Sequence, residues 1–370
     1  MKQVAPYTKK AKGYLWAYFT GEGKGAEAIS LSLSKGNDAL NWYTLNEGKA
    51  IIYSKEGEKG LRDPFILRSH DNKKFYLLAT DLKIYQRPNS SFETAQVNGS
   101  RYIEIFESKD LIHWSEQRHV LVSSKYVGNT WAPKAFWDSV SNQYLVFWAS
   151  NLYDEENPVL RNEVNYNRLI YVTTKDFQTF SEPKIWVDVN LGKGHGTIDA
   201  SVVKEGDWYY RFMKEEETMT IRLDRTKNIF ASVIGESYAA KDASENEWCT
   251  LGEKIAVGLP NGEGKLFTSG EGACVFYANE EDVNGHRWFL FIDQPSYHGG
   301  PDHYIGFASK NIEASNSWIP VSDKLRNGLP QNSKGEKPRH GSIISLTEEE
   351  YQRVYQNYNV SKSWREENED

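Results

Sequence analysis

The chain has 370 residues, of which 39% are hydrophobic and 14% aromatic, enough for a packed core, and the many aromatic rings favour β structure. Its formal net charge of -7 excludes the basic footprint of a nucleic-acid-binding protein. No apolar run reaches the ~18 residues of a membrane span. The stretch from Met1 to Pro6 has no signal-peptide core, so the compartment is left open: cytoplasmic, or secreted or periplasmic for a trimmed chain.

The predicted elements are short strands. The first runs from residue 14 to 20, and the second, from 28 to 34, alternates aliphatic residues with serine, which is typical of a strand with one buried face. A third lies around Trp42. The same order then returns, with strand-like runs at 65–67, 74–80, 102–108, 134–137, 143–148, 168–173, 201–203, 208–213, 219–223, 273–277, 287–292, 304–309 and 342–346. Residues 234–266 are predicted to form a loop.

A three-residue motif precedes the first strand of each unit. The triplets are Arg62-Asp63-Pro64, Trp131-Ala132-Pro133, Ile198-Asp199-Ala200, Gly270-Glu271-Gly272 and Arg339-His340-Gly341. Their middle residues are 69, 67, 72 and 69 positions apart. A constant period with the same internal order indicates one supersecondary unit that is repeated.

A second marker lies before the last strand of a unit. A hydroxyl residue followed by lysine occurs at Ser34, Ser108, Thr174 and Ser309, and an aromatic residue follows each time, at Trp42, Trp114, Phe180 and Trp318. One copy is ordinary turn chemistry, but four in the same register support the repeat.

The two ends of the chain complete each other. The first strands have no triplet of their own, and the last triplet is followed by one strand only. We therefore predict an all-β, five-bladed β-propeller in which residues 340–346 pair beside residues 14–20 and close the last blade, because closure removes exposed sheet edges. The whole chain, 1–370, forms one domain, with the propeller at about 14–347. Residues 348–370 are a tail that starts as a helix at Glu348.

Propeller geometry brings distant residues together. The first strands line the axis, so Asp63, Asp199, Glu271 and His340 are expected at one mouth of the channel. Three crowded carboxyl groups repel when ionised, which raises the pKa of at least one of them and suits acid and base chemistry. The alternative is that acidic residues are simply common in turns that enter strands.

These motifs, in this order over essentially the whole chain, resemble glycoside hydrolase family 43. The resemblance implies that Asp63 is the general base, Asp199 the pKa modulator and Glu271 the general acid. Ala200 and Ala273 stand where proline is commoner in the family, and the carboxylates are in place nonetheless. The segments Tyr18–Glu22 and Ala79–Leu82 resemble a branch associated with α-L-arabinofuranosidase activity.

The implied reaction is inverting release of a terminal pentosyl residue from arabinose-containing plant polysaccharides or oligosaccharides. Glu271 would protonate the leaving oxygen, Asp63 would activate water, and the charge of Asp199 would keep Glu271 protonated. Trp131 is the first choice for a sugar platform, and Glu22 and Asp81 are further candidates for contact with substrate. No cofactor is required; His340 would hold either an axial Ca²⁺ through its water shell or a buried water.

Several alternatives stay open. Within the same family these are a β-xylosidase and an endo-arabinanase. From other classes they are a non-catalytic carbohydrate-binding propeller, a retaining fructosyl hydrolase and a protein-interaction scaffold. The three carboxylates in register favour an enzyme over the lectin and the scaffold, and the position of Arg62-Asp63-Pro64 in the first complete blade argues against the fructosyl hydrolase. The expected partner is a carbohydrate, and the sequence leaves the oligomeric state open.

Overall fold

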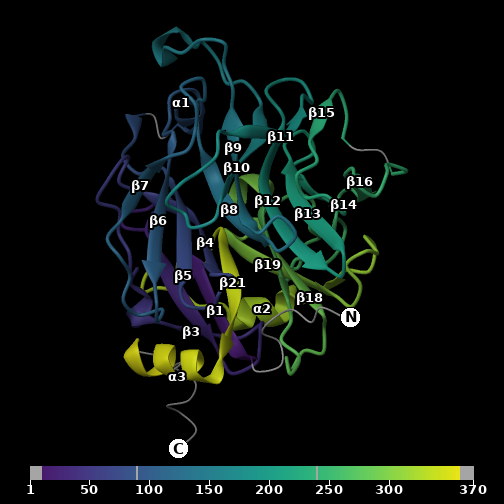
Figure 1. Ribbon diagram of the computed structural model, residues 1–370. Coiled ribbons are helices and arrows are strands. Elements are labelled where there is room, and N and C mark those ends of the chain that lie inside the picture. Colours follow the sequence, from purple (N-terminus) through teal and green to yellow (C-terminus); the bar gives the residue numbers. More distant parts are fainter. Residues whose placement is uncertain (1–10, 89–90, 239–240, 359–370) are drawn as a thin grey trace, which may run out of the picture.

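Five β-sheets form a ring around a central axis in the computed structural model, which describes residues 11–88, 91–238 and 241–358 (Figure 1). The predicted all-β propeller with five blades is confirmed. The stretch from Met1 to Pro6 and the tail beyond residue 358 lie outside the described residues.

Each blade begins at the axis and runs outward, and neighbouring strands pair antiparallel apart from one parallel pair. Blade 1 contains β4 (Leu61–Arg68), β5 (Phe75–Asp81), β6 (Tyr102–Ser108) and β7 (Arg118–Leu121). Blade 2 contains β8 (Trp131–Asp138), β9 (Gln143–Asn151), β10 (Asn167–Thr174), β11 (Lys184–Val189) and β15 (Val233–Gly235). Blade 3 contains β12 (Thr197–Glu205), β13 (Trp208–Glu215), β14 (Thr220–Thr226) and β16 (Cys249–Gly252). Blade 4 contains β17 (Glu271–Tyr277), β18 (Trp288–Gln294), β19 (His303–Ser309) and β20 (Ile319–Pro320).

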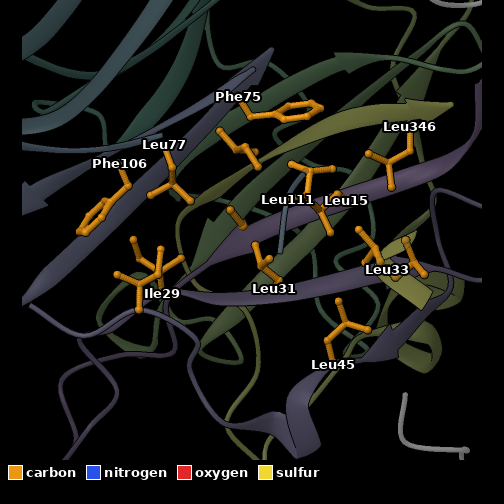
Figure 2. Packing of buried hydrophobic residues seen from close by; sticks show 14 of the residues in the cluster. Leu15, Ile29, Leu31, Leu33, Leu45, Phe75, Leu77, Phe106, Leu111 and Leu346 are labelled. Carbon is orange, nitrogen blue, oxygen red and sulfur yellow. The ribbon is translucent and has the colours of Figure 1, made fainter. Parts of the chain in front are cut away.

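Blade 5 is built from both ends of the chain. Its order is β21 (Gly341–Thr347), β1 (Ala11–Tyr18), β2 (Ser30–Ser34) and β3 (Trp42–Thr44). Strand β21 pairs antiparallel with β1, with Gly341 opposite Tyr18. Side chains from β1, β2 and β21 then pack against those of blade 1 in one core cluster, as Figure 2 shows. The predicted closure is therefore confirmed, and it joins the first and last described strands.

In the described part of the chain, three α-helices accompany the sheets: α1 (Phe92–Val97), α2 (Ser322–Gly328) and α3 (Glu348–Asn357). Helix α3 starts at the predicted residue because Thr347 caps it and Glu350 completes the capping box. Arg68 in blade 1 pairs with Glu350, which holds the helix under the ring. Among the described residues no helix combines the length and the apolar character needed to span a membrane.

The insertion after β14 is not the loop that was predicted. It contains β15, which pairs parallel to β11 as a fifth strand of blade 2, and β16, which is the outer strand of blade 3. The outer strands β7 and β11 also begin four residues after Trp114 and Phe180, where they were expected. The hydroxyl markers explain this offset, because Ser108 Oγ and Thr174 Oγ1 accept backbone N–H bonds (2.8 and 3.0 Å) that prolong the turn.

The first strands of four blades share one backbone irregularity. Each pairing with the second strand shifts register at the motif, and one residue there is left-handed, with φ of 50° at Asp63, 53° at Ala132, 58° at Asp199 and 60° at Gly272. Such β-bulges re-aim side chains at functional rims. In blades 1 to 3 the left-handed residue is the middle residue of the triplet, but in blade 4 it is Gly272, the last one. Glu271 therefore stands one position before the left-handed residue of its blade.

Closure by β21 predicts that a core residue on this strand has a large effect on stability. Leu346 is fully buried in the cluster that joins blades 5 and 1. We expect Leu346→Ala to lower the free energy of unfolding by about 2–5 kcal/mol, because it removes buried methyl groups and leaves a cavity. Urea unfolding followed by tryptophan fluorescence measures the change. Leu121→Ala is the control, because this side chain is 49% exposed. It should change the free energy of unfolding by no more than about 0.5 kcal/mol.

Candidate active site

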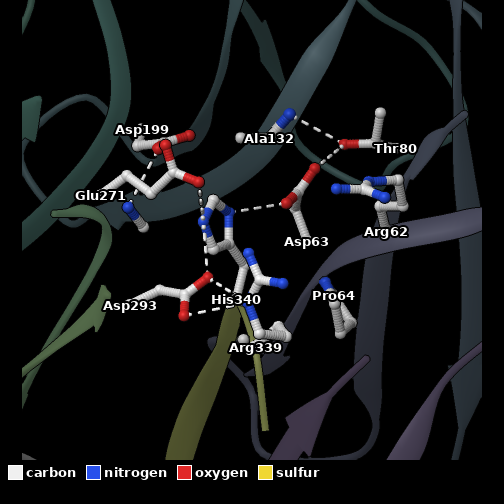
Figure 3. Close-up of polar contacts among 12 residues, drawn as sticks. Arg62, Asp63, Pro64, Thr80, Ala132, Asp199, Glu271, Asp293, Arg339 and His340 are labelled. Carbon is white, nitrogen blue, oxygen red and sulfur yellow. Dashed lines mark hydrogen bonds and ion pairs between the residues drawn. The ribbon is translucent and has the colours of Figure 1, made fainter. Parts of the chain in front are cut away.

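The structure brings the three predicted carboxylates together at one mouth of the channel. Asp63, Asp199 and Glu271 come from β4, β12 and β17, and each residue is less than 10% exposed. His340, just before β21, lies among them, as Figure 3 shows. A fourth carboxylate, Asp293 of β18, joins the group and was not predicted.

The imidazole of His340 bridges the acidic groups. Its Nδ1 lies 2.8 Å from Asp63 Oδ1, and its Nε2 lies 3.4 Å from Glu271 Oε1 and 3.3 Å from Asp293 Oδ2. Burial alone would lower the pKa of His340, but the charge of Asp199 and then the contacts with Asp63 and Glu271 raise it well above its usual value. His340 is therefore an imidazolium, and Asp63 and Glu271 lie at opposite nitrogens of its ring.

Asp63 is held as a carboxylate. Thr80 Oγ1 donates to its Oδ2 at 2.7 Å, and the same hydroxyl oxygen accepts from the backbone N–H of Ala132 at 2.8 Å. Burial would raise the pKa of Asp63, but the hydrogen bond and charge of His340, followed by Arg62, lower it below the usual range. An ionised carboxylate fixed by two partners is in the state that a general base requires.

Glu271 has three close cationic or polar partners besides His340. Lys214 Nζ lies 2.6 Å from its Oε2, His298 Nε2 lies 3.2 Å from the same oxygen, and the Tyr297 hydroxyl donates to Oε1. Burial would raise the pKa of Glu271, but Lys214 and then His298 and His340 hold it well below the usual range. The expectation that Asp199 keeps Glu271 protonated is therefore wrong for this arrangement, because a lysine is in direct contact with the acid.

Asp199 behaves as crowding predicts. Its Oδ2 accepts from the backbone N–H of Gly272 at 2.9 Å. Burial raises the pKa of Asp199, His340 opposes the rise, and the charge of Glu271 adds to it. The pKa of at least one carboxyl group in the ring is raised, as expected. Of these two neighbouring carboxyl groups, Asp199 has the raised pKa and Glu271, which Lys214 contacts, has the lowered one.

The further candidates for substrate contact have different surroundings, and of the three only Glu22 lines the groove described below. Glu22 pairs with Arg62 at 2.8 Å and approaches Arg339 at 3.8 Å. Trp131 is half-buried and packs edge-on against Phe92, with ring centroids 6.2 Å apart. Asp81 is a correction: it is the last residue of β5, and its carboxylate accepts from the backbone N–H of Glu58 (2.7 Å) and lies near Glu104 and His119 instead of the acid ring.

The residues at the axis do not fit a Ca²⁺ ion. Asp199, Glu271 and His340 have donor atoms within 4.8 Å of one another, but the enclosed cavity beside them measures about 10 Å³, room for roughly one water molecule. Ca²⁺ takes about 6–8 oxygen ligands and does not favour a neighbouring imidazolium. His340 instead acts as the cation of the site.

A groove of about 560 Å³ opens beside the acid ring. It runs between loops of blades 4 and 5, and Arg339 and Glu22 connect it to the ring, because Arg339 Nε lies 2.7 Å from Asp293 Oδ2. Ser296, next to Tyr297, forms part of its wall. The lining is mostly polar and includes charges of both signs, which suits a polyhydroxylated ligand.

Comparison with known families decides what kind of protein carries this site. The family model described as "Probable glycosyl hydrolase domain", which is related to glycoside hydrolase family 43, matches residues 9–352. The chain belongs to this glycosyl hydrolase family. The sequence resemblance is thereby confirmed at the level of the family.

This glycosyl hydrolase matches only part of the length of each individual relative. An α-L-arabinofuranosidase of Bifidobacterium longum subsp. longum is 35% identical over 226 residues, which cover 58% of this chain and 20% of that protein. A GH62 hydrolase solved with xylotriose is 14% identical, with a TM-score of 0.46 and 76% of each chain covered. An arabinanase of Bacillus subtilis is 16% identical, with a TM-score of 0.42, 79% of this chain and 81% of that chain covered. TM-scores below 0.5 carry no information about the substrate of this chain.

The residues that sequence reasoning missed lie on second strands and their loops. Lys214 and Asp293 are the last but one residues of β13 and β18, whereas the sequence motifs lie on first strands only. A charged residue at the end of an otherwise buried apolar strand is the signal that marks both. Tyr297 and His298, in the loop Pro295–Gly300 that follows β18, also contact Glu271.

The bulge of blade 4 predicts a steric test of the site. A Cβ at Gly272 would lie 2.4 Å from Cδ2 of His340, with φ at 60°. We expect Gly272→Ala to cost about 1–2 kcal/mol for the left-handed backbone and a further ~1–3 kcal/mol for the clash, and to displace His340.

Gly206→Ala is the matched control, because Gly206 has φ of 59° and an added Cβ would meet nothing within 4 Å. It should show the backbone cost alone. Thermal unfolding of both variants gives the comparison, and equal losses would contradict the close packing of His340 on Gly272.

Proposed function

We propose that the chain is an inverting exo-acting α-L-arabinofuranosidase that removes terminal arabinofuranosyl residues from plant polysaccharides or oligosaccharides. The observation that carries this proposal is the placement of Asp63 and Glu271 at opposite nitrogens of His340, at the mouth of the channel. An inverting pair needs a separation of roughly 6.5–9.5 Å, so that water fits between one carboxylate and the sugar. Family membership and the partial match to an arabinofuranosidase support the substrate.

In the proposed reaction, Asp63 takes a proton from the water that attacks the anomeric carbon. Its lowered pKa and the hydrogen bond from Thr80 keep it ionised and oriented for this role. Glu271 donates a proton to the leaving oxygen on the other face of the sugar, and the bond from the anomeric carbon to that oxygen breaks. Water supplies both the new hydroxyl on the sugar and the proton that Asp63 receives.

Glu271 must gain its proton before it can act as the acid. Since Lys214 holds Glu271 in the ionised state and Asp199 has the raised pKa, we propose that a substrate hydroxyl draws Lys214 away from Glu271. The pKa of Glu271 then rises, and Asp199, whose pKa is raised, is the neighbouring group that can exchange a proton with it. In this proposal Asp199 is ionised in one state of the site and protonated in the other.

The sugar left behind by cleavage is expected in the polar groove between blades 4 and 5. Tyr297 donates to the acid and is 67% exposed, next to Ser296 in the groove wall, so the groove starts on the side of the leaving oxygen. Trp131 and Glu22 are proposed to contact the arabinosyl ring, and His340 acts through the two carboxylates that it bridges. One domain, without a required cofactor, carries the proposed activity.

The proposal is tested by hydrolysis of nitrophenyl pentosides, linear arabinan, branched arabinan and arabinoxylan. We expect cleavage of nitrophenyl α-L-arabinofuranoside and release of free arabinose from the branched polymers. Proton NMR in the first minutes should show the anomer opposite to that of the substrate. Faster turnover of a xyloside, oligomeric products from linear arabinan, or retention of configuration would each overturn one part of the proposal.

The role of Glu271 predicts a dependence on the leaving group. Glu271→Gln removes the proton donor, so kcat on natural arabinosides should fall by about 10²–10⁴-fold. With a dinitrophenyl leaving group, which departs without a proton, the loss should be much smaller. Steady-state kinetics on both substrates give the ratio, and equal losses would assign Glu271 to binding instead of proton transfer.

The Lys214 contact predicts a shift in the pH profile. Lys214→Met removes the positive charge that stabilises ionised Glu271, so the pKa of Glu271 rises and the acid stays protonated to higher pH. The alkaline limb of kcat/KM against pH should therefore move upward. Lys204→Met, which makes the same chemical change at a lysine that donates to Tyr209 instead, is the control and should leave the limb in place. A downward shift would contradict the assigned role of Lys214.

A further inference from the structure

A second group of ligand-type side chains lies in blade 1, away from the acid ring. Asp81 ends β5, Glu104 lies in β6 and His119 in β7, three strands that are neighbours in one sheet (Figure 1). Glu104 and His119 stand directly opposite each other in the strand pairing. One donor atom from each of the three residues lies within 4.8 Å of the others. Regular strands therefore hold all three groups in place.

Glu104 is buried with one oxygen unused. Its side chain is 0% exposed, and its Oε1 lies 2.5 Å from Nδ1 of His119. Its Oε2 is buried and has no hydrogen-bond partner among the described residues. Gln117 lies close to this carboxylate and bonds through its amide to Ser54 Oγ (3.0 Å) and to the N–H of Lys55 (2.7 Å), and neither of its amide hydrogens meets Oε2 in hydrogen-bonding geometry. A carboxylate oxygen that is both buried and unpaired needs a ligand to satisfy it.

The charge of the group is also unbalanced. Asp81 and Glu104 are 2% and 0% exposed, and one oxygen of each lies within 4.8 Å of one oxygen of the other. Arg87 acts on Asp81 only at a distance, because its guanidinium is paired with Glu58. His119 alone cannot neutralise two adjacent carboxylates in a buried site, whereas a divalent cation would do so.

The surroundings are shaped for this arrangement. The ring of His119 stacks on Tyr102 with centroids 3.9 Å apart, which orients Nδ1 toward Glu104. The side chain of His119 is 25% exposed, so the cluster of Asp81, Glu104 and His119 has a route to solvent. A Cβ at Gly57 would lie 2.2 Å from Asp81 Oδ2, so glycine at this position lets the loop close over the carboxylate.

We propose that Asp81, Glu104 and His119 bind one divalent transition-metal ion, with Zn²⁺ or Mn²⁺ as the best match. One imidazole and two carboxylates are donors that these ions accept at about 2.0–2.2 Å, and a water would complete the coordination shell. Ca²⁺ is disfavoured because it prefers oxygen ligands throughout.

The ion would stabilise the segment that supports the catalytic base. Thr80, the residue before Asp81 in β5, donates to Asp63. A metal ion at Asp81 fixes this end of β5 to β6 and β7, and it lies outside the acid ring. The site is therefore structural, and its occupancy is read from stability and binding, independently of activity.

The test uses the full chain after treatment with a chelator, titrated calorimetrically with ZnCl₂, MnCl₂ and CaCl₂ in separate runs. We expect one equivalent of Zn²⁺ or Mn²⁺ to bind and to raise Tm. Glu104→Gln should weaken binding at least tenfold. Glu107→Gln is the control on the same strand, since Glu107 pairs with Lys74 and Arg118, and it should bind as the parent does. Glu271→Gln should also bind normally, which excludes the acid ring as the site.

A second variant covers the case in which Glu104→Gln does not fold. His119→Gln changes a partly exposed side chain, and it should weaken binding in the same way. X-ray absorption of the Zn²⁺-loaded parent should show one imidazole among oxygen ligands. The proposal is overturned if the parent binds neither Zn²⁺ nor Mn²⁺ stoichiometrically, if it binds Ca²⁺ more tightly, or if His119→Gln binds as the parent does.

Discussion

The buried imidazolium of His340 is the interaction on which the whole site depends. Several carboxylates with almost no exposed surface can share one ring of strands only when a cation compensates their charge, since unpaired buried charge is costly. His340 meets Asp63, Glu271 and Asp293 with its two nitrogens. Because His340 precedes the strand that closes the propeller, the closure of the fold and the protonation of the acids depend on the same residue.

The repeated bulge explains why a regular sheet can supply such a ring. A left-handed residue at the start of a first strand interrupts the alternation of side chains and costs about 1–2 kcal/mol where the residue is not glycine. Asp63, Ala132 and Asp199 carry this cost. In blade 4 glycine takes the left-handed position, because His340 lies where a Cβ would stand, and the acidic side chain moves back by one residue to Glu271.

Linear patterns predicted the architecture well. The period of the triplets gave the blades, the incomplete ends gave the closure between β21 and β1, and three carboxylates in register gave the acid ring. A contact between the second strand of one blade and the first strand of the next was out of reach, because no spacing in the sequence says that Lys214 of β13 meets Glu271 of β17. The same lack of a pattern hid β15 and β16 inside a polar insertion, and left Asp81 indistinguishable from a pocket residue until its neighbours in β6 and β7 were placed beside it.

Closure by a late strand also sets an order of events during synthesis. A ribosome releases the residues of β1 early and those of β21 after all other described strands. The nascent chain thus holds Asp63, Asp199 and Glu271 before it holds His340, and in that interval nothing from the closing strand neutralises the carboxylates. Four blades can assemble while the fifth waits for its inner strand. In the unfinished protein Lys214 is already present to pair with Glu271, whereas Asp63 gains its contact with an imidazole only when His340 arrives with the closing strand.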